Sequence, residues 1–143
     1  MRKKLWFFLI LVSVFFMPVS AQETGPTAVV KNLYVAVESG DRSRVAGMIS
    51  RDTLVEMKQK GKHKALNSLL DLSSAVSQGV IILRFTNMSV EMEKTDEINA
   101  LAVVTHTVEA RKGSEDIKYP GKDRIILKKE DTGWKITGFE SLN

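Results

Sequence analysis

The hydrophobic pattern of this chain changes its period once, at Gly79, and that change limits the fold class more than any other feature. Before Gly79, apolar residues recur every three or four positions, as they do on one face of a helix. After it, β-branched and aromatic residues alternate with polar ones, as in strands with one buried face. Helices that come first and antiparallel strands that follow predict an α+β domain whose sheet is covered on one face by the helices.

The helical part predicts four segments. Pro26 fits the first turn of a helix, where its missing N–H costs nothing, and Gly40 ends that helix in a left-handed cap. Asp41 is the expected N-cap of a short second helix, and Ser50 or Asp52 of a third. The first helix carries an apolar stripe of Val30, Leu33, Tyr34 and Val37, and the fourth segment, over 62–77, carries Ala65, Leu66, Leu69, Leu70, Leu72 and Val76.

The second part predicts an antiparallel sheet that curls around the first helix and leaves an open end for a pocket. Tyr119, Pro120 and Gly121 are expected to disturb the chain, so that the third long strand begins only at Arg124. Gly138 is expected at a β-bulge that changes which residues point inward. The expected strand runs are 80–86 with 90–93, then 98–110, 124–129 and 134–140.

The N-terminus predicts a cleavable signal peptide. Met1 to Lys4 are positively charged, Leu5 to Met17 form an apolar run, and Val19-Ser20-Ala21 supplies small residues before the cleavage point. The run is shorter than the roughly 20 apolar residues that a spanning helix needs. An uncleaved anchor is the alternative. We therefore expect cleavage near Ala21, a periplasmic or secreted bacterial protein, no stable membrane anchor, and a single domain over 22–143.

Composition excludes several kinds of function. The chain has no Cys, which removes thiol catalysis and Cys-ligated zinc and favours a bacterial envelope protein. Three of the 21 basic residues and none of the 17 acidic ones lie in residues 1–21, so the remainder carries a net charge of only +1. Such a balance argues against a nucleic-acid partner. The basic cluster of Lys58, Lys60, Lys62, His63 and Lys64 is interpreted as a solvated helix junction or, alternatively, as an anion contact.

Two stretches resemble a known superfamily. The opening reads PTAVVKNLYVAVESGD over 26–41 and RSRVAGMIS over 42–50, and the close reads IILKKEDTGWKI over 125–136. Together they are similar to the nuclear transport factor 2-like (cystatin-like) superfamily, and most to its small exported bacterial members of unknown function, some labelled lumazine-binding-like. The resemblance implies a cone-shaped α+β fold over most of 26–140. Enzymes of this superfamily place an acid/base pair in the cone, and no such pair can be matched here, so no catalytic residue is assigned.

The candidate pocket residues are Tyr34, Arg84, His106 and Trp134. His106 lies mid-strand on the face of Ala102 and Val104, where it could titrate near neutral pH; the alternative is a buried structural histidine satisfied by a neighbour. Tyr34, Trp134 and Phe139 are expected to fill the core or, alternatively, to line an apolar pocket, with Arg84 or His106 orienting a polar group. Two histidines and no Cys make a poor metal set, and no phosphate loop or serine elbow is present, so neither a metal nor a cofactor is expected.

Three hypotheses remain open on sequence grounds. The first is a non-enzymatic exported domain that binds a small ligand or an envelope partner. The second is a cone-fold hydrolase or isomerase that uses His106 as its base. The third is an assembly subunit that forms a homodimer through an exposed face of the sheet.

Overall fold

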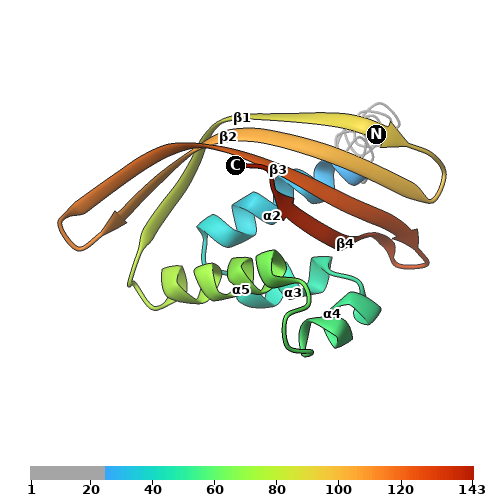
Figure 1. The fold of residues 1–143 in the computed structure, drawn as a ribbon, viewed down its shortest axis with the longest axis horizontal. Coiled ribbons are helices and arrows are strands. Elements are labelled where there is room, and N and C mark those ends of the chain that lie inside the picture. The colour runs from blue at the N-terminus through green and yellow to red at the C-terminus, as the bar shows by residue number, and fades with distance from the viewer. Residues whose placement is uncertain (1–24) are drawn as a thin grey trace, which may run out of the picture.

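A computed structural model describes residues 25–143, and the expected signal peptide lies outside these residues. Four helices precede four strands, and the strands form one antiparallel sheet in the order β1-β2-β3-β4, which confirms the α+β prediction. The helices lie together on one face of the curved sheet (Figure 1). The elements are α2 Pro26–Glu38, α3 Arg42–Met48, α4 Arg51–Met57, α5 Lys64–Ser77, β1 Ile82–Thr95, β2 Asn99–Lys112, β3 Glu115–Glu130 and β4 Gly133–Ser141. Among residues 25–143, none of the helices is both long and apolar enough to cross a membrane.

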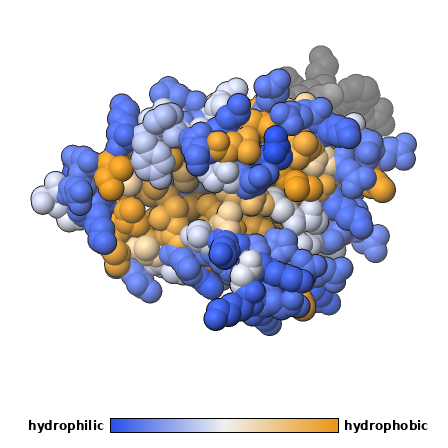
Figure 2. Space-filling view, viewed as in Figure 1, coloured by the Kyte–Doolittle hydropathy of each residue, from blue (hydrophilic) through white to orange (hydrophobic). Residues whose placement is uncertain are grey.

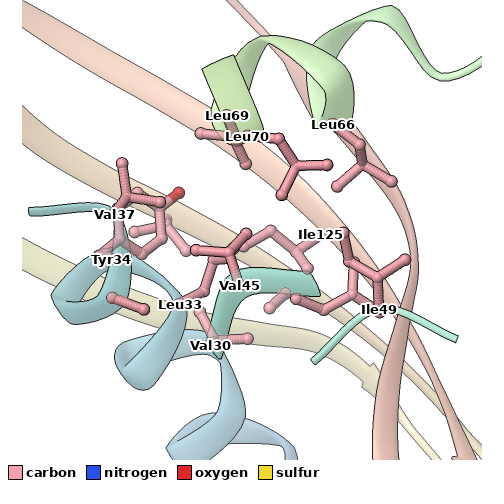
Figure 3. Packing of buried hydrophobic residues seen from close by; sticks show 14 of the residues in the cluster. Val30, Leu33, Tyr34, Val37, Val45, Ile49, Leu66, Leu69, Leu70 and Ile125 are labelled. Carbon is pink, nitrogen blue, oxygen red and sulfur yellow. The ribbon is translucent and has the colours of Figure 1, made fainter. Parts of the chain in front are cut away.

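Helix α2 packs along the inside of the sheet with the stripe that its sequence predicts. Pro26 occupies the first turn, and Val30, Leu33, Tyr34 and Val37 are all buried. Their side chains meet those of α5 and of the sheet in the centre of the domain (Figure 3). The short helices close the lower end of this core through Val45 and Ile49, both of which are buried.

The two short helices, α3 and α4, each start with a side-chain cap. Asp41 accepts a hydrogen bond from Arg44 N at the start of α3, and Ser50, not Asp52, accepts one from Thr53 N at the start of α4. Helix α5 begins at Lys64, and its most buried residues are Leu66, Leu69, Leu70 and Ser73. The basic cluster occupies the junction between α4 and α5, as predicted, and His63 Nε2 lies 2.7 Å from Glu56 Oε2.

Strand β3 is longer than predicted, because it begins at Glu115 and runs through Pro120 without a break. Proline is tolerated in a strand only where its missing N–H faces no partner. Strand β4 pairs with β3 only from Asp123 onward, so at Pro120 one side of β3 is open. The carbonyl of Pro120 points to that open side, where it accepts a hydrogen bond from Asn143 Nδ2 at 2.7 Å. The expected start at Arg124 was therefore wrong.

The predicted bulge near Gly138 is confirmed. Ile126 pairs with Gly138 and Leu127 pairs with Ile136, which leaves Thr137 as the extra residue. Residues three apart in a regular strand point to opposite faces. The bulge cancels this difference, so Ile136 and Phe139 both pack against the core on the side of the helices.

Candidate functional site

A cavity of about 410 Å³ opens between α5 and the helix-facing side of the sheet. Its walls are mainly apolar, and apolar surface is visible in the hollow between sheet and helices in Figure 2. Helix α5 supplies one wall and all four strands contribute to the other. The lining residues are Tyr34, Ala65, Ser68, Leu69, Leu72, Phe85, His106, Val108, Tyr119, Gly121, Asp123, Phe139, Ser141 and Asn143.

Three buried polar side chains meet at one carboxylate oxygen in this cavity. The hydroxyl of Tyr34 donates a hydrogen bond to Asp123 Oδ2 at 2.7 Å. Nε2 of His106 lies 2.6 Å from the same oxygen. Because an ionised carboxylate only accepts hydrogen bonds, this geometry places a proton on His106 Nε2. Helix α2 and strands β2 and β3 thus bring these three residues together, although Tyr34 and Asp123 are 89 positions apart in the sequence.

The alternation of β2 and β3 explains why His106 and Asp123 meet. His106 points toward the helices, as its neighbours Val104 and Val108 do, and all three are buried. Its register partner on β3 is Gly121, and Asp123 lies two residues further along on the same face. A side chain at position 121 would collide with the imidazole, since a Cβ there would lie 2.7 Å from His106 Nδ1. The glycine therefore leaves the space that the His106 ring occupies.

Three rings hold the polar groups in place. Phe85 on β1 meets Tyr34 edge-on, with ring centroids 5.0 Å apart, and meets His106 edge-on at 5.2 Å. The ring centroids of Tyr34 and His106 are themselves 5.3 Å apart. Edge-to-face aromatic pairs are favourable and directional. The donors to Asp123 are consequently fixed by packing as well as by hydrogen bonds.

One oxygen of the Asp123 carboxylate receives no hydrogen bond from residues 25–143. Burial, followed by the charge of Asp123 and the hydrogen bond to it, raises the pKa of Tyr34 far above its ordinary value, so the phenol remains a donor. Both donors converge on Oδ2, and no hydrogen bond within residues 25–143 reaches Oδ1. His106 Nδ1 is also buried without a partner among these residues. The site therefore holds unused hydrogen-bonding capacity beside an apolar cavity.

The structure brings together two of the four predicted pocket residues. Tyr34 and His106 both line the cavity. Arg84 is exposed and, by strand alternation from Phe85, lies on the opposite face of β1. Trp134 is partly buried against the core and is not among the residues that line this cavity.

Sequence reasoning missed Asp123, the partner that His106 needed. The signal was present, because Ile125 and Leu127 define the inward face of β3 and Asp123 continues the same alternation. The expected break at Pro120 and Gly121 placed this residue just outside the predicted strand. Phe85 was predicted within a strand but was not recognised as part of a site.

Acidic side chains outside the cavity have local roles, as Asp96 and Asp116 show. Asp96 Oδ1 accepts hydrogen bonds from the backbone N–H groups of Ile98 and Asn99 in the β1–β2 turn, and these bonds lower the pKa of Asp96. Asp116 pairs with Arg111 at 2.7 Å. Within residues 25–143, no group of three His, Asp or Glu side chains is placed to hold a metal ion.

Comparison with known proteins identifies the fold. No family model and no curated protein sequence matches the chain. Among solved structures, a ketosteroid isomerase-like protein from Erwinia carotovora atroseptica superposes with a TM-score of 0.54 and 13% identity, covering 82% of this chain and 93% of that one. A nuclear transport factor 2-like protein with a cystatin-like fold from Novosphingobium aromaticivorans superposes with a TM-score of 0.53 and 14% identity, covering 80% of this chain and 76% of that one. A candidate dehydratase of the nuclear transport factor 2-like family from Streptomyces avermitilis superposes with a TM-score of 0.54 and 11% identity, covering 80% of this chain and 90% of that one.

These likenesses show that the chain has the nuclear transport factor 2-like, cystatin-like fold, as its sequence predicted. At such low identity the shared fold does not carry an activity from one protein to another. Function has to be argued from the side chains in the cavity.

Proposed function

We propose that this protein is an exported single-domain binding protein that holds a small, largely apolar molecule in the cavity around Asp123. The observation that carries the proposal is the open Oδ1 of a buried carboxylate in a mainly apolar pocket. Ligand sites are typically apolar cavities of about 300 to 1,000 Å³ with a few fixed polar groups, and this cavity has that size and composition. Export rests on the signal-peptide pattern of residues 1–21.

The polar groups are arranged to orient a ligand. Tyr34 and His106 keep the Asp123 carboxylate in one position, which leaves Oδ1 as a fixed acceptor. Leu69 and Leu72 of α5 offer apolar contact on the opposite wall. A ligand with one polar end and an apolar body satisfies both sides, and a buried polar group gains from receiving a partner.

A second function, proton transfer, is favoured by the close contact between His106 and Asp123. A carboxylate with a free oxygen and an imidazole 2.6 Å from its other oxygen form an acid/base pair beside a substrate-sized cavity. In this function Asp123 Oδ1 would accept a proton from the substrate. Asp123→Asn would then abolish turnover while substrate binding remained.

Native mass spectrometry of the secreted protein tests the binding function. We expect an additional, reproducible mass on the wild-type protein, and its loss in Ala65→Phe, because Ala65 lines the cavity and a larger side chain fills it. Asp71→Phe on the exposed side of the same helix is the matched control and should keep the mass. An additional mass that survives unchanged in Ala65→Phe would place the ligand elsewhere and contradict the proposal.

A further inference from the structure

The charges that line the cavity are unusually one-sided. Residues 25–143 contain 18 Lys and Arg residues, yet none of these side chains lines the cavity. Asp123 is the one acidic side chain in the lining that these residues form. A bound anion would therefore meet a carboxylate and no compensating cation, which is strongly unfavourable in a site of low dielectric constant.

The two donors to Asp123 do not neutralise it. The Tyr34 hydroxyl is a neutral donor. His106 donates through Nε2, and its Nδ1 is buried with no acceptor among the described residues. A second N–H at Nδ1 would thus be buried and unpaired, a costly arrangement, so the geometry suits the neutral imidazole. The imidazole therefore adds no positive charge beside the carboxylate, and Oδ1 is the carboxylate oxygen that is left for a ligand.

The walls add a second attraction for positive charge. Phe85, Tyr119 and Phe139 line the cavity together with Tyr34. The faces of aromatic rings carry partial negative charge and attract cations within about 6 Å of the ring centre. Aromatic rings that share a cavity with a carboxylate are a suitable environment for an organic ammonium group. Its N–H can donate to the oxygen while its carbon atoms contact the rings.

We propose that the ligand of this cavity is a hydrophobic amine that binds as its ammonium ion. Its N–H donates to Asp123 Oδ1, and its aryl or alkyl body lies between the aromatic residues and the α5 wall of Leu69 and Leu72. This inference rests on the proposed binding function and narrows it to one chemical class. Carboxylates and phosphates of the same size are excluded by the charge of Asp123.

Three matched probes test this inference: tryptamine, tryptophol and indoleacetate, which share an indole body and carry an ammonium, a hydroxyl and a carboxylate. Their dissociation constants are measured with the wild-type protein by NMR titration at neutral pH. We expect tryptamine to bind at least about tenfold more tightly than tryptophol, the difference between a charge-assisted and a neutral hydrogen bond. Indoleacetate should bind more weakly than either.

Two variants locate the effect. In Asp123→Asn the tryptamine preference should fall to about onefold while tryptophol still binds, and in Ala65→Phe all three probes should lose affinity together. If tryptophol or indoleacetate binds the wild-type protein as tightly as tryptamine does, and Ala65→Phe removes that binding, the amine inference is overturned and the binding function stands. If none of the three probes binds, both the amine inference and the proposal that the cavity accepts an indole-sized ligand are overturned. The wild-type ranking decides the question even if Asp123→Asn fails to fold.

Discussion

At the scale of single residues, the site depends on a glycine that carries no chemistry. Gly121→Ala would place a methyl group in the space that the His106 ring occupies. We expect a loss of about 1 to 3 kcal/mol in unfolding free energy, because the ring must move and the hydrogen bond to Asp123 must lengthen. Urea unfolding measures the stability, and the NMR signal of the His106 Nε2 proton reports the bond.

The matched control for this substitution is Gly47→Ala. Gly47 lies in α3, and a Cβ at this position would meet no atom within 4 Å. Alanine there should be neutral or stabilising by up to about 1 kcal/mol through its better helix propensity. Equal stability of the two variants would contradict the role assigned to Gly121.

Tyr34 should make the free energy of unfolding fall as the pH rises above about 10. Burial and Asp123 raise its folded-state pKa, so above about pH 10 the unfolded chain loses the phenolic proton while the folded chain keeps it. The unfolded state then binds fewer protons, and the unfolding free energy should fall by about 1.4 kcal/mol per pH unit from this residue alone. This contribution is complete below pH 10 and lost as the pH rises.

Tyr34→Phe isolates that contribution, since it removes the proton but keeps the ring against Phe85. Urea unfolding between pH 9 and 11 should show a shallower decline in the variant than in the wild-type protein. The variant should also lose about 1.5 to 3 kcal/mol at neutral pH, the typical value of a hydrogen bond to a charged group. Identical slopes would show that the phenol does not stay protonated in the folded state.

At the scale of elements, Gly40 allows the chain after α2 to approach the last turn of α5 closely. Its φ of +72° is in the left-handed region, and a Cβ there would lie 2.7 Å from the backbone N of Ser77. Gly40→Ala combines conformational strain with a collision between helices, and we expect it to cost about 2 to 4 kcal/mol. Gly79→Ala is the control, because Gly79 has a φ of +74° and a Cβ there would meet no atom within 4 Å. A similar loss in both, measured by thermal or urea unfolding, would mean that the close approach of the helices is unimportant.

Much of the fold was predictable from such elements, because their signals are local. Periodicity, a proline at the first turn and a glycine at the end define α2, and alternation defines β2. The site was only half predictable, because it depends on which strands pair and where. Pro120 breaks a strand unless one of its sides is open, and that side is open only because β4 pairs from Asp123 onward. Register of this kind is a property of the sheet, and no pattern within β3 contains it.

Strand alternation explains why Arg84 lies outside the cavity. Arg84 belongs to a correctly predicted strand, but adjacent residues of a strand point to opposite faces. Arg84 alternates with Phe85, which does line the cavity. The strand was therefore predicted correctly, but the residue selected for the pocket lies on its opposite face. Trp134 packs against the core, but it lies near the start of β4, whereas the β4 residues that line the cavity are Phe139 and Ser141 near its end.

At the scale of the whole molecule, the helices lie on one face of a curved sheet (Figure 1). The cavity is lined by residues of α5 and of that face of the sheet. Tyr34, Asp123 and His106 come from three different elements, so the carboxylate is fully assembled only in the folded domain. Ligand binding should therefore be linked to folding. A ligand at 100 times its dissociation constant would stabilise the domain by about 2.7 kcal/mol.

Export is the prediction that concerns the entire chain. Expressed in a bacterium from its own Met1, the protein should accumulate in the envelope as a species that begins at Gln22, because signal peptidase cleaves after small residues such as Ser20 and Ala21. Intact-mass measurement of the envelope and cytoplasmic fractions tests this. Replacing Leu9 and Val12 by Arg is the informative variant, since charge in the apolar run should block export and leave the uncleaved chain in the cytoplasm. A full-length species in the membrane fraction of the wild-type protein would instead indicate the uncleaved anchor.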